Sequence, residues 1–170
     1  MTQVWFTADT HFGHRNIIKY CQRPYGSIEE MDQALIENWN DTVAPDDVIF
    51  HLGDVAFMPS LNELFTKTLN GDKLLIRGNH DRRKVVRTLP IGIPILSSAQ
   101  VHNIFGHKVW MDHYPPEEPL PEDVMALAGH HHNQHPIQEH WIDVGVDAWD
   151  YRPVNFNELL NIHRRTKWKS

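Results

Sequence analysis

Eight residues lie shortly after an apolar run and have side chains that can bind a metal ion or transfer a proton. They are Asp9, His11, Asp54, Asn79, His80, His113, His130 and His132. The set offers carboxylate, imidazole and amide groups and no thiolate. This mixture suits Mn²⁺, Fe, Zn²⁺ or a similar divalent ion and excludes a sulfur-ligated structural zinc site. The chain has 13 histidines, and they form no terminal tag.

The spacing within this set favours shared coordination. Asp9 and His11 lie two positions apart, and on a strand that leaves a sheet such side chains point the same way. His130 and His132 repeat the arrangement. A glycine directly precedes three of the eight residues, and a residue without a Cβ lets the backbone turn sharply and a ligand approach closely.

Three short apolar runs predict the strands that position the first half of the set. They cover residues 4–8, 48–52 and 74–76. Continuous apolar runs of this length are typical of strands buried on both faces. Ligands in open α/β sheets bind outside the carboxyl ends of the strands, so we expect the polar residues that follow the runs to share one edge.

Two helices are predicted between these strands. Ser27 and Glu30 have capping-box spacing, and apolar residues then recur at helical spacing to about Thr42. Ser60 and Glu63 repeat the pattern at the start of a second helix. The first half therefore predicts the order β-α-β-α-β, with crossovers long enough for parallel pairing.

The second half of the chain predicts a different arrangement. Residues 100–105 and 108–111 flank a Gly-His pair and predict an antiparallel hairpin. Residues 124–128 form another apolar strand, with which residues 140–144 can pair. A last helix is expected to open at Asn155.

Five blocks in this order resemble the calcineurin-like metallophosphoesterase superfamily. The blocks are Asp9-Thr10-His11, Gly53-Asp54, Gly78-Asn79-His80-Asp81, His113 and Gly129-His130-His131-His132. The resemblance is to a small, single-domain member of the superfamily. It is not to the protein Ser/Thr phosphatase subgroup, because the residues after Gly53-Asp54 lack the arginine-bearing extension of those enzymes. It implies an α/β fold, a four-layer α/β/β/α sandwich of two mixed sheets flanked by helices, and residues 1–170 are expected to form one domain.

The resemblance also implies a role for each residue of the set. Asp9, His11 and His132 would hold one metal ion. Asn79, His113 and His130 would hold a second, and Asp54 would bridge the two. His80 would face the substrate and assist the leaving group, with Asp81 as a candidate to orient it. The implied cofactors are two divalent metal ions, with Mn favoured and Fe, Zn, Ni or Co as alternatives.

The expected function is hydrolysis of a phosphate ester by a water that the two metal ions activate. A phosphodiester or nucleotide-type substrate is favoured, and a phosphomonoester of a small metabolite is the alternative. Candidate substrate-binding residues are His14, Arg15 and Asn16, at the start of a short helix where anions are favoured, and Arg82. A capping and solvation role is the alternative for His14, Arg15 and Asn16. Arg82 belongs to a basic segment, residues 73–87, for which a solvated helix face is the alternative to a rim that attracts a polyanionic substrate.

Three other readings stay open. The His80-Asp81 pair also occurs in phosphohydrolases of the HD type, but their all-helical fold conflicts with the predicted strands at 4–8 and 48–52. A non-catalytic scaffold of the same fold is disfavoured because all eight residues are present. A metal-storage role predicts many loosely bound ions in place of two.

Composition limits the partners and the compartment. Lys and Arg number 16 against 22 Asp and Glu, for a net charge of −6, so bulk charge does not favour long nucleic acid and leaves it as an uncertain partner. No signal peptide or membrane-spanning run is visible, and Cys21 is the only cysteine. These features predict a cytoplasmic protein with no membrane partner and leave its oligomeric state open.

Overall fold

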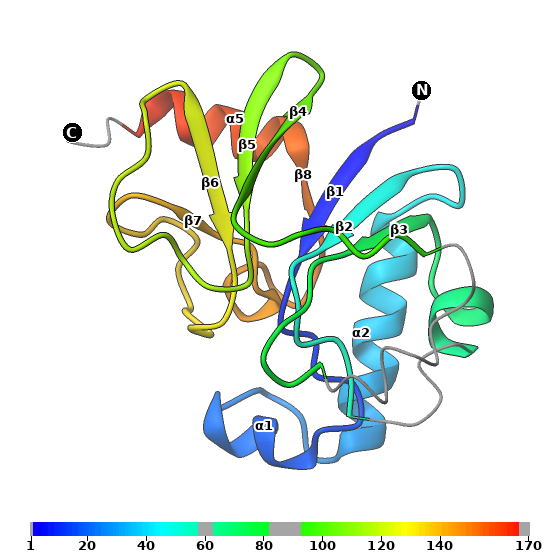
Figure 1. Ribbon diagram of the computed structural model, residues 1–170. Helices are drawn as coiled ribbons and strands as arrows, with labels where there is room; N and C mark the ends of the chain where they lie inside the picture. Colours follow the sequence, from blue (N-terminus) through cyan, green and yellow to red (C-terminus); the bar gives the residue numbers. More distant parts are fainter. Residues whose placement is uncertain (1, 58–62, 82–92, 167–170) are drawn as a thin grey trace.

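The computed structural model of the protein describes residues 2–57, 63–81 and 93–166. Four strands form the first sheet, in the spatial order β3-β2-β1-β8 (Figure 1). They are β1 (Val4–Thr7), β2 (Val48–His51), β3 (Asp72–Leu75) and β8 (Val154–Asn155). The first three pair in parallel, and β8 runs antiparallel to β1.

The second sheet has the order β4-β5-β6-β7. Its strands are β4 (Gln100–Ile104), β5 (His107–Met111), β6 (Val124–Ala128) and β7 (Ile142–Asp143). The predicted hairpin is confirmed, since β4 and β5 pair antiparallel, while β5, β6 and β7 pair in parallel. Both sheets are mixed, which confirms the expected α/β fold of two mixed sheets with helices.

Within the described ranges, three α-helices connect or follow these strands. They are α1 (Arg15–Tyr20), α2 (Ile28–Thr42) and α5 (Phe156–Arg165). The predicted cap of α2 is confirmed, because the Ser27 hydroxyl accepts a hydrogen bond from the Glu30 amide at 3.1 Å. The predicted helix start at Ser60 lies outside the described residues, which include a short π-helical turn at Leu64–Thr68.

The buried apolar residues form three clusters, two of which pack against the first sheet. Phe6 of the first sheet packs with Met111 and Leu127 of the second, and Leu159 of α5 joins them. On the other face of the first sheet, Trp39 and neighbouring residues of α2 cover β2 and β3. Burial of each large apolar side chain contributes about 1.5–3 kcal/mol, so both faces of the first sheet stabilise the fold. No helix among the described residues has the length and apolar character needed to cross a membrane.

Edge strands of both sheets differ from the sequence prediction, and in the second sheet β7 covers only residues 142–143 of the expected 140–144. The third strand was expected at 74–76 but begins at Asp72, because Asp72 and Lys73 pair with Val48 and Ile49 at the edge of the sheet. Polar residues are tolerated there, so the apolar run covers only part of the strand. Strand β8 was missed because two residues carry too little pattern.

Asp47 ties the start of β2 to β1. The buried carboxylate accepts hydrogen bonds from the Gln3 amide at 2.8 Å, the Trp5 indole at 2.9 Å and the Ala44 amide at 3.1 Å. Burial works against the charged form, but these three donors outweigh it and lower the pKa of Asp47. Asp47 therefore contributes stability above its unfolded-state pKa, and this contribution is lost as pH falls through its lower folded-state pKa.

We predict that Asp47→Ala lowers the free energy of unfolding at pH 7 by about 1–3 kcal/mol, because it removes the acceptor of three part-buried hydrogen bonds. Urea unfolding measures the loss. The matched control is Asp46→Ala at the exposed neighbouring position, expected to change stability by less than about 0.5 kcal/mol. Equal losses in the two variants would contradict the assignment.

Candidate metal centre

The carboxyl ends of β1, β2, β3, β5 and β6 bring the predicted metal ligands together. His11 Nε2 and His113 Nε2 each lie 3.5 Å from Asp54 Oδ2. Asn79 Oδ1 lies 2.8 Å from His113 Nε2 and 3.1 Å from His130 Nδ1. The structure therefore joins five of the predicted ligands through direct side-chain contacts.

Asp9 and His132 complete the set. The ligand atoms of Asp9, His11 and His132 lie within 4.8 Å of one another, and those of Asp9, Asp54 and His113 do the same. The first group is the ligand set that the sequence predicted for one ion. The second group, Asp9, Asp54 and His113, contains two of the ligands expected for the other ion, namely Asp54 and His113. The two remaining ligands expected for that ion, Asn79 and His130, are in contact with His113.

Two buried atoms of this cluster have no hydrogen-bond partner. They are Asp9 Oδ1 and His11 Nε2, and both residues are almost fully buried. Buried polar atoms are normally paired, so each such atom needs an explanation. A divalent cation would bind both atoms, and the surrounding nitrogen and oxygen donors are of the type that such ions take. The residues present therefore fit a metal ion.

The backbone of the cluster is unusual. Five of the predicted ligands have left-handed φ angles, namely Asp9 (57°), His11 (53°), Asp54 (57°), His130 (74°) and His132 (52°). Such angles are uncommon outside glycine, and strained residues cluster at functional sites. Two of the predicted glycines make room for this backbone, because a Cβ on Gly78 would overlap the Asp54 carboxylate and one on Gly129 would overlap that of Asp9.

Burial shifts the protonation of the cluster. It raises the pKa of Asp9 and of Asp54, because a buried carboxylate loses hydration. It lowers the pKa of His11, His113 and His130, which keeps these imidazoles neutral at pH 7. A histidine must be neutral to bind a metal, so the three histidines are in the form that coordination requires.

His132 differs from the other histidines. Burial opposes its charge, but hydrogen bonds from its ring to Asp147 and Cys21 outweigh burial and raise its pKa to about 10. The bond from Nδ1 to Asp147 Oδ2 is 2.8 Å long. The same carboxylate receives two hydrogen bonds from Arg23, each 2.9 Å. Cys21, His132 and Asp147 also form a possible ligand group, but Arg23 already holds both oxygens of Asp147.

Arg23 and Asp147 were missed from the sequence. Asp147 closely follows a short apolar stretch, as Asp9 follows residues 4–8, and this is the signal that could have found it. No sequence pattern pairs it with Arg23, which lies 124 positions away.

His80 lies beside the cluster but contributes no ligand atom to the two groups above. Its side chain is exposed, and its ring centroid lies 5.5 Å from that of His11. Its backbone amide donates a 2.8 Å hydrogen bond to Asp54 Oδ1, which ties the position of His80 to the central carboxylate of the cluster.

The predicted pairing of Asp81 with His80 needs correction. The Asp81 carboxylate accepts hydrogen bonds from the amides of Asp54, Val55 and Gly78, at 2.8 to 2.9 Å. These bonds hold the loops after β2 and β3 against each other. Asp81 therefore shapes the backbone of the site, because its oxygens are directed at amides of the loops.

Of the predicted substrate-binding residues that the structure describes, only His14 is seen in contact with the candidate ligands. His14 lies in the site, with Nδ1 at 3.4 Å from His11 Nδ1 and its ring stacked on Phe57 at 4.0 Å. Arg15 and Asn16 are exposed at the start of α1. Arg82 lies outside the described residues.

Two other histidines have clear surroundings. His51 is a hydrogen-bonded core residue, as the sequence indicated, and its Nε2 donates to the Thr10 hydroxyl at 2.9 Å. Its burial lowers its pKa to about 3, so it is neutral. His131 is exposed between two candidate ligands and lies near Trp141.

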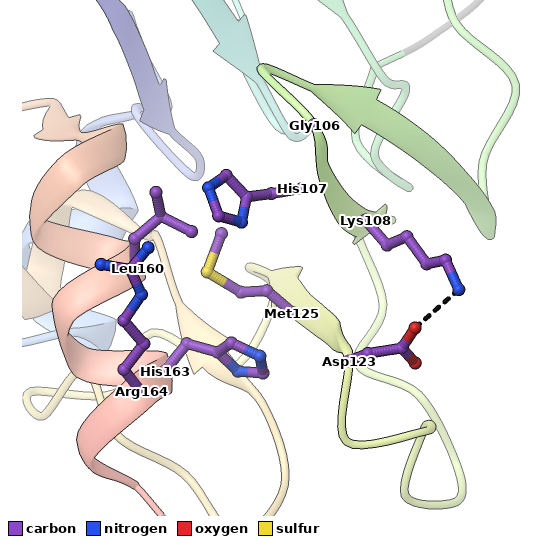
Figure 2. A pocket seen from close by; sticks show the side chains of 8 residues that line it. All are labelled: Gly106, His107, Lys108, Asp123, Met125, Leu160, His163 and Arg164. Carbon is purple, nitrogen blue, oxygen red and sulfur yellow. Dashed lines mark hydrogen bonds and ion pairs between the residues drawn. The ribbon is translucent and has the colours of Figure 1, made fainter.

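A cavity of about 320 Å³ lies at the opposite end of β5 and β6, against α5 (Figure 2). Its walls include Met125, Leu160 and His107, and an ion pair of 2.6 Å joins Lys108 to Asp123 at its side. None of the predicted site residues lines it, and it starts at the amino ends of the strands whose carboxyl ends carry the metal cluster.

No family model matches the chain. Its fold is shared with the crystal structure of the protein of unknown function AQ665 from Aquifex aeolicus, with a TM-score of 0.74, 24% identity, and coverage of 95% of this chain and 100% of that one. The gene 66 protein of Mycobacterium phage L5 is 25% identical over 197 residues, covering 95% of this chain and 94% of that protein. The gene 66 protein of Mycobacterium phage D29 is 27% identical over 201 residues, covering 95% and 97%.

The similarity is higher to the uncharacterized protein MJ1445 of Methanocaldococcus jannaschii. The two are 32% identical over 180 residues, which cover 98% of this chain and 94% of that protein. Identity at this level over nearly the whole of both chains shows common ancestry, and the chain belongs to the family of MJ1445.

Proposed function

We propose that the protein is a metal-dependent phosphoesterase of the calcineurin-like type that hydrolyses a phosphodiester or nucleotide-type substrate. The observation that carries this proposal is the convergence of the seven candidate ligands at the carboxyl ends of strands from both sheets, with Asp9 Oδ1 and His11 Nε2 buried and without a hydrogen-bond partner. Its single cysteine, Cys21, fits the reducing conditions of the cytoplasm, where we place it.

The two groups of side chains would hold two cations. Asp9, His11 and His132 would bind one, Asn79, His113 and His130 the other, and Asp54 would reach both. When bound, two divalent cations lower the pKa of a water and offset the charge that builds on the phosphoryl oxygens. Asn79 adds a neutral oxygen, which limits the negative charge that a phosphate must approach.

In this proposal His80 assists the leaving group. Its exposed ring lies beside the rings of His11 and Phe57, and its backbone is anchored on Asp54. From this position the imidazole can donate a proton or a hydrogen bond to the departing oxygen.

Ring side chains border the cluster and favour a substrate with a nucleobase. Tyr114, about half exposed, lies 4.5 Å from the ring of His130. Phe57 and His14 stack beside His80, and the exposed Tyr20 lies next to His14. Stacking on a base stabilises binding by about 1–3 kcal/mol per base. A small metabolite phosphate without a ring would leave these surfaces unused.

Calorimetric titration of metal-free protein with Mn²⁺ tests the cation sites. We expect two ions to bind per chain, and Asp54→Ala to weaken both binding steps because Asp54 would reach both ions. His131→Ala is the control, since His131 is exposed between two candidate ligands. The proposed site would be contradicted if the wild-type protein bound no Mn²⁺, or if His131→Ala weakened Mn²⁺ binding as much as Asp54→Ala.

His80→Ala tests the role in leaving-group departure. We expect kcat to fall by about 10²–10⁴-fold for a diester with an alkoxide leaving group, with Mn²⁺ content unchanged. The fall should be smaller for a p-nitrophenyl ester, because p-nitrophenolate departs without a proton. His135→Ala, at an exposed loop position, is the control. Equal effects on the two leaving groups, or none, would show that His80 has another role.

Tyr114→Leu tests the substrate class with two esters that share one leaving group. For the p-nitrophenyl ester of thymidine 5′-phosphate, we expect KM to rise by about tenfold, because a stacking surface is lost. For methyl p-nitrophenyl phosphate, KM should stay unchanged. Phe105→Leu, an exposed ring at the β4–β5 turn, is the control. The same change in KM for both esters would argue against base stacking.

A further inference from the structure

Arg23 carries a positive charge into the interior, and its environment is specific. Its side chain has no exposed surface, and its guanidinium makes a two-pronged ion pair with the Asp147 carboxylate. Taking two charges out of water carries a large desolvation cost, and such pairs often contribute little net stability. The main effect of the pair is therefore expected on the geometry of the residues that it contacts.

The same guanidinium holds the backbone of the first ligand loop. Nη2 donates to the Asp9 carbonyl at 2.7 Å, and Nη1 donates to the Thr10 carbonyl at 3.0 Å. This loop carries Asp9 and His11 at left-handed φ angles, a conformation that persists only where the surroundings hold it in place. Arg23 supplies two of the hydrogen bonds that do so.

The other half of the pair acts on His132. Asp147 Oδ2 accepts a 2.8 Å hydrogen bond from His132 Nδ1. A carboxylate can only accept, so Nδ1 carries a hydrogen and is directed at Asp147. Partners of this kind fix the ring orientation of metal-binding histidines.

These contacts all converge on one of the two candidate cation sites. Asp9, His11 and His132 are its ligands, and Arg23 with Asp147 touches the backbone or side chain around each of them. The contacts recorded for Asn79, His113 and His130 include neither residue. The pair therefore distinguishes the two sites.

We propose that Arg23 and Asp147 are positioning residues that set the affinity of the Asp9–His11–His132 site for its cation and leave the Asn79–His113–His130 site largely unaffected. The inference rests on the proposed two-cation function. Arg23 holds the loop and Asp147 holds the ring, so the three ligands face a common point before a cation arrives.

Asp147→Asn and Arg23→Lys test the proposal on metal-free protein titrated with Mn²⁺. We expect one of the two binding steps to weaken by about 10–100-fold and the other to stay unchanged. At subsaturating Mn²⁺ the electron paramagnetic resonance signal of a coupled Mn²⁺ pair should be lost and that of a single ion retained. A merely structural role would lower the melting temperature without splitting the two steps.

Asp150→Asn is the matched control. Asp150 is exposed and lies three positions after Asp147, and the substitution exchanges the same two side chains. Asp147→Glu is a rescue variant, expected to recover part of the weakened step because it restores the carboxylate. If wild type binds two ions and both steps are unchanged, or weaken equally, in Asp147→Asn and Arg23→Lys, the proposal is wrong and the proposed function stands. If wild type binds none, both fail.

Discussion

A group of buried carboxylates at the carboxyl ends of strands from both sheets is the constraint around which this molecule is built. Asp9, Asp54 and Asp81 are each almost fully buried at the loops that follow the parallel strands. Asp143 is fully buried as well, and burial raises its pKa to about 6. The one buried arginine in the part of the chain that the structure describes is Arg23, which pairs with Asp147. The remaining carboxylates need backbone amides or cations to stabilise their charge.

Some of these carboxylates are bound by backbone amides alone, and others keep an oxygen that is directed at the histidines of the cluster. Asp81 receives three backbone amides and so joins two loops. Asp9 and Asp54 each accept a backbone amide with one oxygen, from His130 and His80 respectively. The other oxygens face the histidines of the cluster. The same side chains thus fasten loops from distant parts of the chain and present atoms suited to a metal ion.

Much of this arrangement was predictable from local pattern. The apolar runs placed β1, β2 and β6 almost to the residue, and the Ser27 cap and helical spacing placed α2. The five motif blocks identified residues that the fold brings into contact. Contacts between distant, isolated residues could not be predicted: Arg23 and Asp147 have no periodicity, and the three amides around Asp81 exist only after two loops have met.

The left-handed backbone at five candidate ligands restricts which residue types can stand there, in addition to the restriction that metal binding imposes. Asn, Asp and His are the non-glycine residues most often found at such φ angles, and Asp and His are the types present. Coordination chemistry and local backbone sterics therefore favour the same short list. A designer who exchanged His11 for cysteine or Asp9 for glutamate to recruit another metal would strain the loop as well as change the donor atom. Redesign of metal preference has more freedom at His113 and Asn79, which are absent from the positive-φ positions.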